Sequence, residues 1–81
     1  MQSDDIEQRI LDATCEFRIT HLYSPSQREI ADSVFVSPST VNRHVRRLID
    51  RGLLQRTGAN SRYLIPTPAV EDNYRKQKEA I

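Results

Sequence analysis

The chain has 81 residues, of which 37% are apolar and 28% charged, and its formal net charge is +1. This composition predicts one small globular domain with a thin core and no room for a deep substrate cleft, so we expect a binding protein and not an enzyme. One cysteine and two histidines exclude a disulfide framework and disfavour a zinc site. We therefore expect no cofactor, and we expect neither a signal peptide nor a membrane span but a cytoplasmic protein.

The first predicted helix covers roughly residues 4–20. Asp4 and Glu7 resemble a capping box at its start. Pro25 ends the pattern, because proline disfavours the helical conformation at the residue before it. The apolar residues that recur at helical spacing are Ile6, Ile10, Ala13, Phe17 and Leu22.

Two further helices follow within a short distance. Ser26 and Glu29 form a second capping box, which opens a short helix with Ile30, Ala31 and Val34 on its inward side. Ser37 and Pro38 then provide an N-cap followed by proline at the first helical position. The third helix runs over residues 38–51 and ends before Gly52. Its buried stripe consists of Val41, Val45, Leu48 and Ile49.

The last third of the chain predicts a β-hairpin and a final helix. Residues 53–57 and 62–65 read as strands joined by the loop 58–61, and Pro66 closes the second strand. Thr67 and Pro68 then begin a helix with Val70, Tyr74 and Ile81 on a narrow apolar stripe. That stripe packs either on the first helix or against a second copy of the chain.

This order of elements is that of a winged helix-turn-helix. The fold class is mainly α with a small β-hairpin: a three-helix core, a wing and an extra C-terminal helix. We expect one domain over residues 1–66 and a helix or tail over residues 67–81.

Charge is distributed unevenly along the chain. Residues 1–36 carry three Arg against seven acidic residues, a net charge of −4, whereas residues 37–66 carry six Arg against Asp50 alone, a net charge of +5. A segment this basic is typical of a surface that faces phosphate. The alternative is a solvated helix face that happens to be basic.

Several motifs resemble those of bacterial winged-helix transcriptional regulators. They are Ile30-Ala31, the run from Val36 to Val45 (VSPSTVNRHV), and Leu48 with Arg51-Gly52-Leu53-Leu54. Residues 24–31 (SPSQREIA) and 58–62 (GANSR) resemble the DNA-binding domain of LexA-type repressors.

The chain departs from the LexA pattern in three ways. The turn before the third helix is one residue shorter. Phe35 occupies a position where such turns usually carry Gly, and a bulky side chain is costly at positive φ, so we expect this turn to be open or reshaped. Nothing resembling the LexA peptidase domain follows Pro66, so we expect no self-cleavage.

The resemblance and the helical wheel together place the third helix in the major groove of DNA. Arg43 is the candidate for guanine, Asn42 for adenine, and the Thr40 methyl for thymine. Ser37 at the helix start suits a phosphate. The outward residues of this helix are Ser39, Thr40, Asn42, Arg43, Arg46 and Arg47.

Other candidates are expected to contact the DNA backbone. Arg46 and Arg47 reach phosphates, and Ser26, Gln27 and Arg28 meet the other strand. Arg62, with Asn60, belongs to the wing at residues 57–62 and reaches phosphate or the minor groove.

Each candidate has a structural alternative. Arg46 or Arg47 could pair with Asp50, and Arg62 could be a plain surface charge. His44 is expected to pack or hydrogen-bond, and Cys15 to be a buried apolar group.

The sequence therefore predicts a sequence-specific double-stranded DNA-binding transcriptional regulator. We expect a homodimer, with the C-terminal helix as one possible contact, and hence a palindromic operator. Two alternatives remain open: a winged-helix protein-interaction module, and a DNA-binding fragment of a longer regulator. A module that binds left-handed nucleic acid is disfavoured, because Arg46 stands where such modules carry Tyr and the chain has no Trp.

Overall fold

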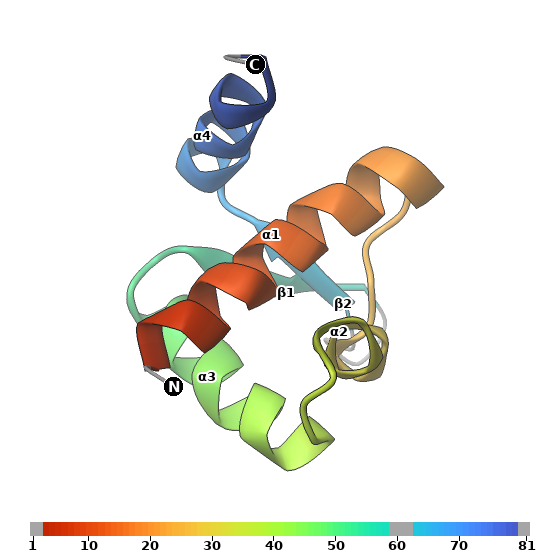
Figure 1. The fold of residues 1–81 in the computed structure, drawn as a ribbon, viewed down its shortest axis with the longest axis vertical. Helices are drawn as coiled ribbons and strands as arrows, with labels where there is room; N and C mark the ends of the chain where they lie inside the picture. Colours follow the sequence, from red (N-terminus) through yellow and green to blue (C-terminus); the bar gives the residue numbers. More distant parts are fainter. Residues whose placement is uncertain (1–2, 59–62, 80–81) are drawn as a thin grey trace.

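A computed structural model describes residues 3–58 and 63–79 of the chain. Its helices are α1 (Ser3–His21), α2 (Gln27–Val34), α3 (Pro38–Asp50) and α4 (Pro68–Glu79), with strands β1 (Leu54–Thr57) and β2 (Tyr63–Pro66) between α3 and α4. In Figure 1, α1 crosses the middle of the molecule, α2 and α3 lie below it, the hairpin lies behind it and α4 lies above it. The predicted order of elements is confirmed. In the described part of the chain, no helix is both long and apolar enough to cross a bilayer.

One apolar cluster joins the first three helices to the hairpin. Helices α2 and α3 contribute residues spaced three or four apart, and Ile6 and Ala13 extend the contribution of α1 at the same spacing, so one face of each helix points inward. The burial of such side chains is the main favourable term in the folding of a domain this small. The buried members of the cluster are Ile10, Leu11, Ile30, Ala31, Val34, Val41, Val45, Leu48, Leu54 and Leu64.

The helix starts follow from local hydrogen bonds, as predicted. Ser26 Oγ accepts the N–H of Glu29 at 3.1 Å, and the Glu29 carboxylate accepts the N–H of Ser26 at 2.9 Å, which completes a capping box. Ser37 Oγ accepts the N–H of Thr40 at 3.3 Å, and Pro38 is the first residue of α3.

The turn between α2 and α3 contains a residue in the left-handed conformation, and this residue is not glycine. Phe35 has φ 58° and ψ 42°, and its N–H donates to the carbonyl of Ala31. The expectation of an open or reshaped turn is therefore wrong. The Phe35 side chain is 92% exposed, so it meets no steric conflict, and the cost is the local one of a left-handed L-residue, about 1 kcal/mol.

Two predictions about α1 are also wrong. Glu7 is buried, and its carboxylate binds side chains of α3 where a capping-box role at the start of α1 was expected. Leu22 does not extend the apolar stripe, because α1 ends at His21 and Leu22 adopts φ 62° with its side chain 86% exposed.

The segment before α2 pairs with strand β2 at the edge of the hairpin. Leu64 donates its N–H to the carbonyl of Pro25 at 2.9 Å, and Ser26 forms an isolated antiparallel bridge with Tyr63. In the hairpin itself Leu54 pairs with Pro66, and Arg56 pairs with Leu64. The start of α2 is therefore held beside the wing strands. The wing residues Asn60 and Arg62 lie outside the described residues.

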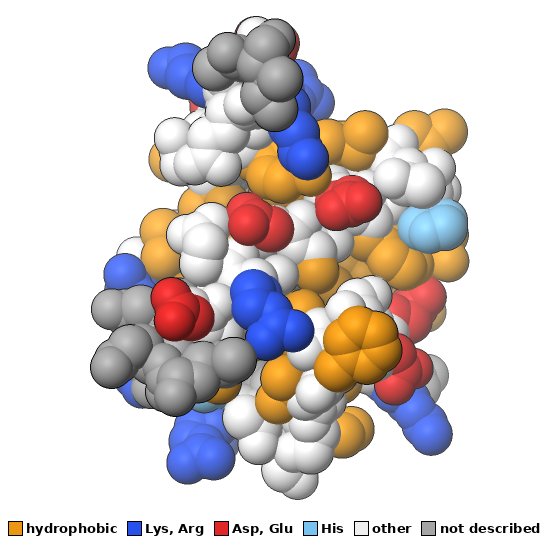
Figure 2. All heavy atoms as spheres, viewed as in Figure 1, with side chains coloured by type: hydrophobic (Ala, Val, Ile, Leu, Met, Phe, Trp, Pro, Cys, Tyr) orange, Lys and Arg blue, Asp and Glu red, His pale blue; other side chains and the backbone are white. Residues whose placement is uncertain are grey.

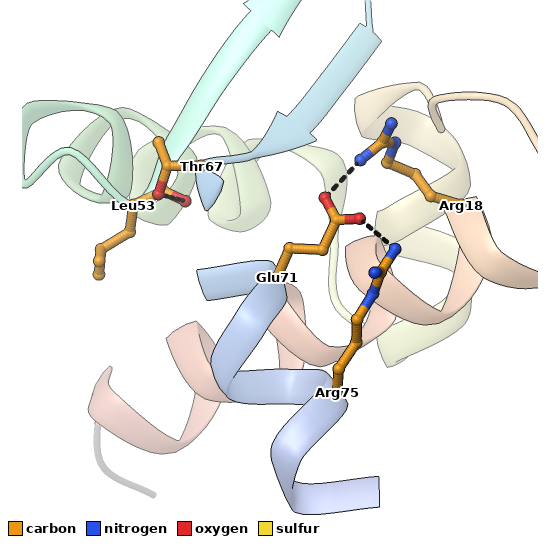
Figure 3. Close-up of polar contacts among 5 residues, drawn as sticks. All are labelled: Arg18, Leu53, Thr67, Glu71 and Arg75. Atoms are coloured by element: carbon orange, nitrogen blue, oxygen red, sulfur yellow. Dashed lines mark hydrogen bonds and ion pairs between the residues drawn. The ribbon is translucent and has the colours of Figure 1, made fainter. Parts of the chain in front are cut away.

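Helix α4 packs on α1 of its own chain, which is one of the two predicted alternatives. Tyr74 is buried and Val70 packs against the core. Figure 3 shows Glu71 between two cations: its carboxylate lies 2.9 Å from Arg18 of α1 and 3.0 Å from Arg75 of α4. Ile81 lies outside the described residues.

Replacement of Gly58 by Ala is expected to destabilise the fold more than replacement of Gly52 by Ala. Both glycines have positive φ (82° and 77°), so each substitution pays the left-handed penalty of about 1 kcal/mol. A Cβ on Gly58 would also overlap the ring of Tyr63, whereas a Cβ on Gly52 would meet nothing within 4 Å. We expect an additional loss of at least about 1 kcal/mol for Gly58→Ala. Urea unfolding of both variants measures the difference, and equal losses would contradict the predicted overlap.

Candidate nucleic-acid interface

Helix α3 has a fully buried face and an opposite face that is open to solvent. Val41, Val45 and Leu48 have no exposed surface, which confirms these members of the predicted stripe, and Ile49 packs against the core while partly buried. Ser39, Arg43 and Arg46 are exposed. Their spacing of four and three residues places them together on one side of the helix. This exposed face of α3 therefore presents two guanidinium groups and a hydroxyl.

Both signs of charge are visible on the face drawn in Figure 2: acidic side chains lie over α1 and α2, and basic side chains lie near α3 but also over α1 and α4. The excess of positive charge at α3 comes from the helix itself, which carries Arg43, Arg46 and Arg47 against Asp50 alone. An anionic ligand approaching the α3 end meets an excess of positive charge.

A groove adjoins the exposed face of α3. It lies where the starts of α2 and α3 meet strand β1, and its lining residues are Ser26, Gln27, Arg28, Pro38, Asn42 and Arg56. Four of these residues, Ser26, Gln27, Arg28 and Asn42, were candidates from the sequence. The fold brings them together although they come from two helices.

Gln27 links the three elements around the groove. Its side-chain amide donates to Asn42 Oδ1 at 3.2 Å, and its Oε1 accepts from Arg56 Nη2 at 3.4 Å. These contacts hold the amide plane of Asn42 and direct Arg56 toward the helix starts. Sequence reasoning missed Arg56 as a site residue. It was visible only as one member of the basic segment, because its nearness to Gln27 depends on the pairing of the hairpin with the segment before α2.

The hydroxyl groups of the two capping serines form hydrogen bonds within the helices that they cap. The Ser26 hydroxyl accepts from Glu29, and the Ser37 hydroxyl accepts from the backbone of Thr40 and donates to its Oγ1 at 3.0 Å. What the helix starts offer to an anion is therefore their free backbone N–H groups and the positive end of the helix dipole.

Arg47 lies one turn after Arg43, at the border of the exposed face of α3 on the side of α1. Its Nε is 3.5 Å from Glu7 of α1, so its partner is Glu7 and not Asp50. Within residues 3–58 and 63–79, no ion pair joins Asp50 to Arg46 or Arg47. His44 is buried with its Nδ1 2.9 Å from Glu7, which confirms a hydrogen-bonding role.

The described residues hold no group of three or more His, Cys, Asp or Glu side chains suited to a metal ion. Cys15 is buried, as predicted. Burial raises the pKa of the Cys15 thiol from 9.0 to about 11, and the nearby carboxylates of Glu71 and Asp12 add to the rise. The neutral thiol is a poor nucleophile, so Cys15 is a core residue and not a reactive centre.

Comparison with known proteins agrees with this geometry. Residues 24–55 match a family described as winged helix-turn-helix DNA-binding. This match runs from the segment before α2 into β1, and no curated protein matches the chain. A solved structure similar to the chain is the crystal structure of MepR, a transcription regulator of the Staphylococcus aureus multidrug efflux pump MepA. It superposes with a TM-score of 0.60 at 15% identity, over 96% of this chain and 74% of that chain, which confirms the winged-helix fold.

The raised pKa of Cys15 predicts slow alkylation in the folded protein. Because the folded pKa lies above the unfolded one, the thiolate fraction at pH 8 is about a hundredfold smaller in the folded state. We expect iodoacetamide to label Cys15 at least that much more slowly in buffer than in urea at the same pH. Mass spectrometry follows the labelling. Equal rates in the two solvents would mean that the Cys15 thiol is accessible in the folded protein.

Proposed function

We propose that this winged helix-turn-helix chain is a sequence-specific double-stranded DNA-binding transcriptional regulator. The observation that carries the proposal is the exposed face of α3, where Ser39, Arg43 and Arg46 stand opposite a fully buried apolar stripe. An α-helix fits the major groove of B-DNA, and a basic face is what the phosphate backbone attracts. The match of residues 24–55 to a DNA-binding family supports the same conclusion.

Three side chains of α3 are proposed to read bases. Arg43 is exposed and its guanidinium suits O6 and N7 of guanine. Asn42 suits adenine. Gln27 orients the Asn42 amide by donating to its Oδ1. Asn42 can still bind a base, because its Oδ1 keeps a second lone pair and its own N–H groups remain to donate. The Thr40 methyl is proposed to contact thymine.

The remaining contacts are proposed to position the protein on the backbone. Arg28 and Arg56 supply positive charge at the groove, and Arg46 supplies it on the exposed face of α3. The free N–H groups after Ser26 and Ser37 are proposed to donate to phosphate oxygens. Asn60 and Arg62 of the wing are proposed for the backbone or the minor groove.

We keep the homodimer and the cytoplasmic location as proposals. Val70 and Tyr74 already pack within their own chain, so a dimer contact would use other residues. The likeness of residues 24–31 to LexA-type repressors favours repression. The MepR structure, described as that of a transcription regulator, fits a regulatory role.

A second candidate function is a protein-interaction module. The observation that favours it is a set of large apolar residues that are exposed outside α3: Ile19, Leu22 and Tyr23 at and after the end of α1, and Phe35 in the turn between α2 and α3. An exposed apolar surface of this kind often marks a binding site for another protein. The two candidates differ in which surface binds, so one experiment separates them.

Selection from a random double-stranded DNA pool at physiological salt tests the proposal. Enrichment of a palindrome with half-sites about one helical turn apart would support a sequence-specific dimer. An asymmetric site would keep DNA recognition and remove the dimer. If no sequence is enriched and only weak salt-sensitive binding is found, the protein-interaction candidate takes precedence.

Substitution of Arg43 and of Arg46 by Ala is expected to have different effects. Arg43→Ala loses a base contact, so it costs about 1–3 kcal/mol on the selected site and relaxes preference at one position. Arg46→Ala loses a phosphate contact, so it weakens binding to all duplexes and lowers the salt slope by about 1. Fluorescence anisotropy on selected and scrambled duplexes, over a range of salt concentrations, measures both effects.

Arg75→Ala is the matched control for these variants. Arg75 is an exposed arginine on α4 that pairs with Glu71, away from α3. Its removal is expected to leave DNA affinity unchanged. If Arg43→Ala and Arg46→Ala behave like Arg75→Ala, then α3 is not the surface that contacts DNA.

A further inference from the structure

Glu7 connects α1 to one side of α3 through three contacts. Its Oε2 lies 2.9 Å from His44 Nδ1 and 3.5 Å from Arg47 Nε, and its Oε1 accepts from Arg51 Nη1 at 2.9 Å. Residues 44, 47 and 51 are three and four apart, and Arg51 is the C-cap of α3, so the three form one stripe along the helix and its end. This stripe lies between the buried face of α3 and its exposed face.

The two arginines of this stripe are not buried. The Glu7 side chain is 3% exposed, whereas the Arg47 and Arg51 side chains are 56% and 57% exposed. A buried carboxylate requires charged or hydrogen-bonding partners, because an unpaired one is strongly destabilising. Glu7 therefore draws both guanidinium groups toward α1, although their side chains remain at the solvent boundary.

An arginine at the edge of a DNA-binding helix adds affinity for any sequence if it reaches a phosphate. Two such contacts would raise the binding to random DNA as much as the binding to an operator, and so would add nothing to discrimination. The carboxylate of Glu7 competes with phosphate oxygens for these cations, because it accepts an N–H of Arg51 and lies within ion-pair distance of Arg47 Nε.

We propose that Glu7 is a specificity-determining residue that holds Arg47 and Arg51 away from DNA phosphates and thereby limits sequence-independent affinity. This inference rests on the proposed function. Among the described residues, Arg43 and Arg46 are then the arginines of α3 that form no ion pair and can bind DNA. Arg47 has a role different from the phosphate contact expected from the sequence.

The variant Glu7→Gln tests the proposal. It keeps the shape of the side chain and removes its charge, so Arg47 and Arg51 are released toward the DNA. Each added phosphate contact steepens the slope of log K against log salt by about 0.9, so we expect a steepening of roughly 1 to 2. The ratio of affinities at 50 mM and 200 mM salt then grows about 3.5-fold for each contact. A purely structural role would weaken binding and would not steepen the slope.

Glu16→Gln is the matched control. Glu16 is an exposed residue of the same helix, and its replacement changes the net charge by the same amount. We expect Glu16→Gln to leave the salt slope as in the wild type. If it steepens the slope as much as Glu7→Gln does, the effect is one of net charge alone and the proposal is overturned.

Arg51→Gln provides a test that does not depend on the folding of Glu7→Gln. If Glu7 holds Arg51 away from DNA, Arg51→Gln leaves the salt slope of the otherwise wild-type chain unchanged. In the Glu7→Gln background, when circular dichroism shows that it is folded, the same substitution reverses part of the steepening. A slope that falls by about 1 on Arg51→Gln alone overturns the proposal, because Arg51 then already contacts phosphate.

The failure of this inference and the failure of the proposed function give different results. If the wild-type chain shows no salt-dependent binding to duplex DNA, the proposed function fails and the inference fails with it. If the wild-type chain binds duplex DNA and folded Glu7→Gln has the same salt slope, only the inference is overturned.

Discussion

The burial of one apolar stripe of α3 determines the orientation of everything else in this small domain. Val41, Val45 and Leu48 pack against α1, α2 and the hairpin with no exposed surface, so α3 cannot rotate about its axis without exposing them. Ser39, Arg43 and Arg46 are outward because those three residues are inward. The chemistry of the exposed face is thus a consequence of core packing, and any change that loosens the core also moves the site.

Besides its apolar packing, α3 takes part in two polar networks that join segments far apart in the chain. On one side Glu7 gathers His44, Arg47 and Arg51, and on the other Gln27 joins Asn42 to Arg56. Apolar packing alone permits small shifts of a helix, whereas hydrogen bonds with defined directions restrict them. These two networks therefore restrict how far α3 can shift relative to α1, α2 and the hairpin. The charge of the Glu7 network also decides which cations remain free.

Some features of the fold carry a local cost. Phe35 and Leu22 adopt left-handed conformations that glycine would adopt more easily, and both side chains are exposed. The turn at Phe35 keeps α2 and α3 in the relation that the site requires, because its N–H and that of Val36 both donate to Ala31. The stability of the core offsets the strain, while α4 adds an ion pair and Tyr74 to the outer side of α1.

The sequence by itself determined the elements that depend on near neighbours: the capping residues Ser26 and Ser37, the stripe from Val41 to Leu48, and the basic outward side of α3. These could be predicted because hydrogen bonds and side-chain periodicity within four residues leave a local pattern. Only the tertiary structure decided the partner of Glu7 and the place of Arg56. Glu7 meets His44 and Arg51 across 37 and 44 residues, and no local pattern records a contact over such a separation.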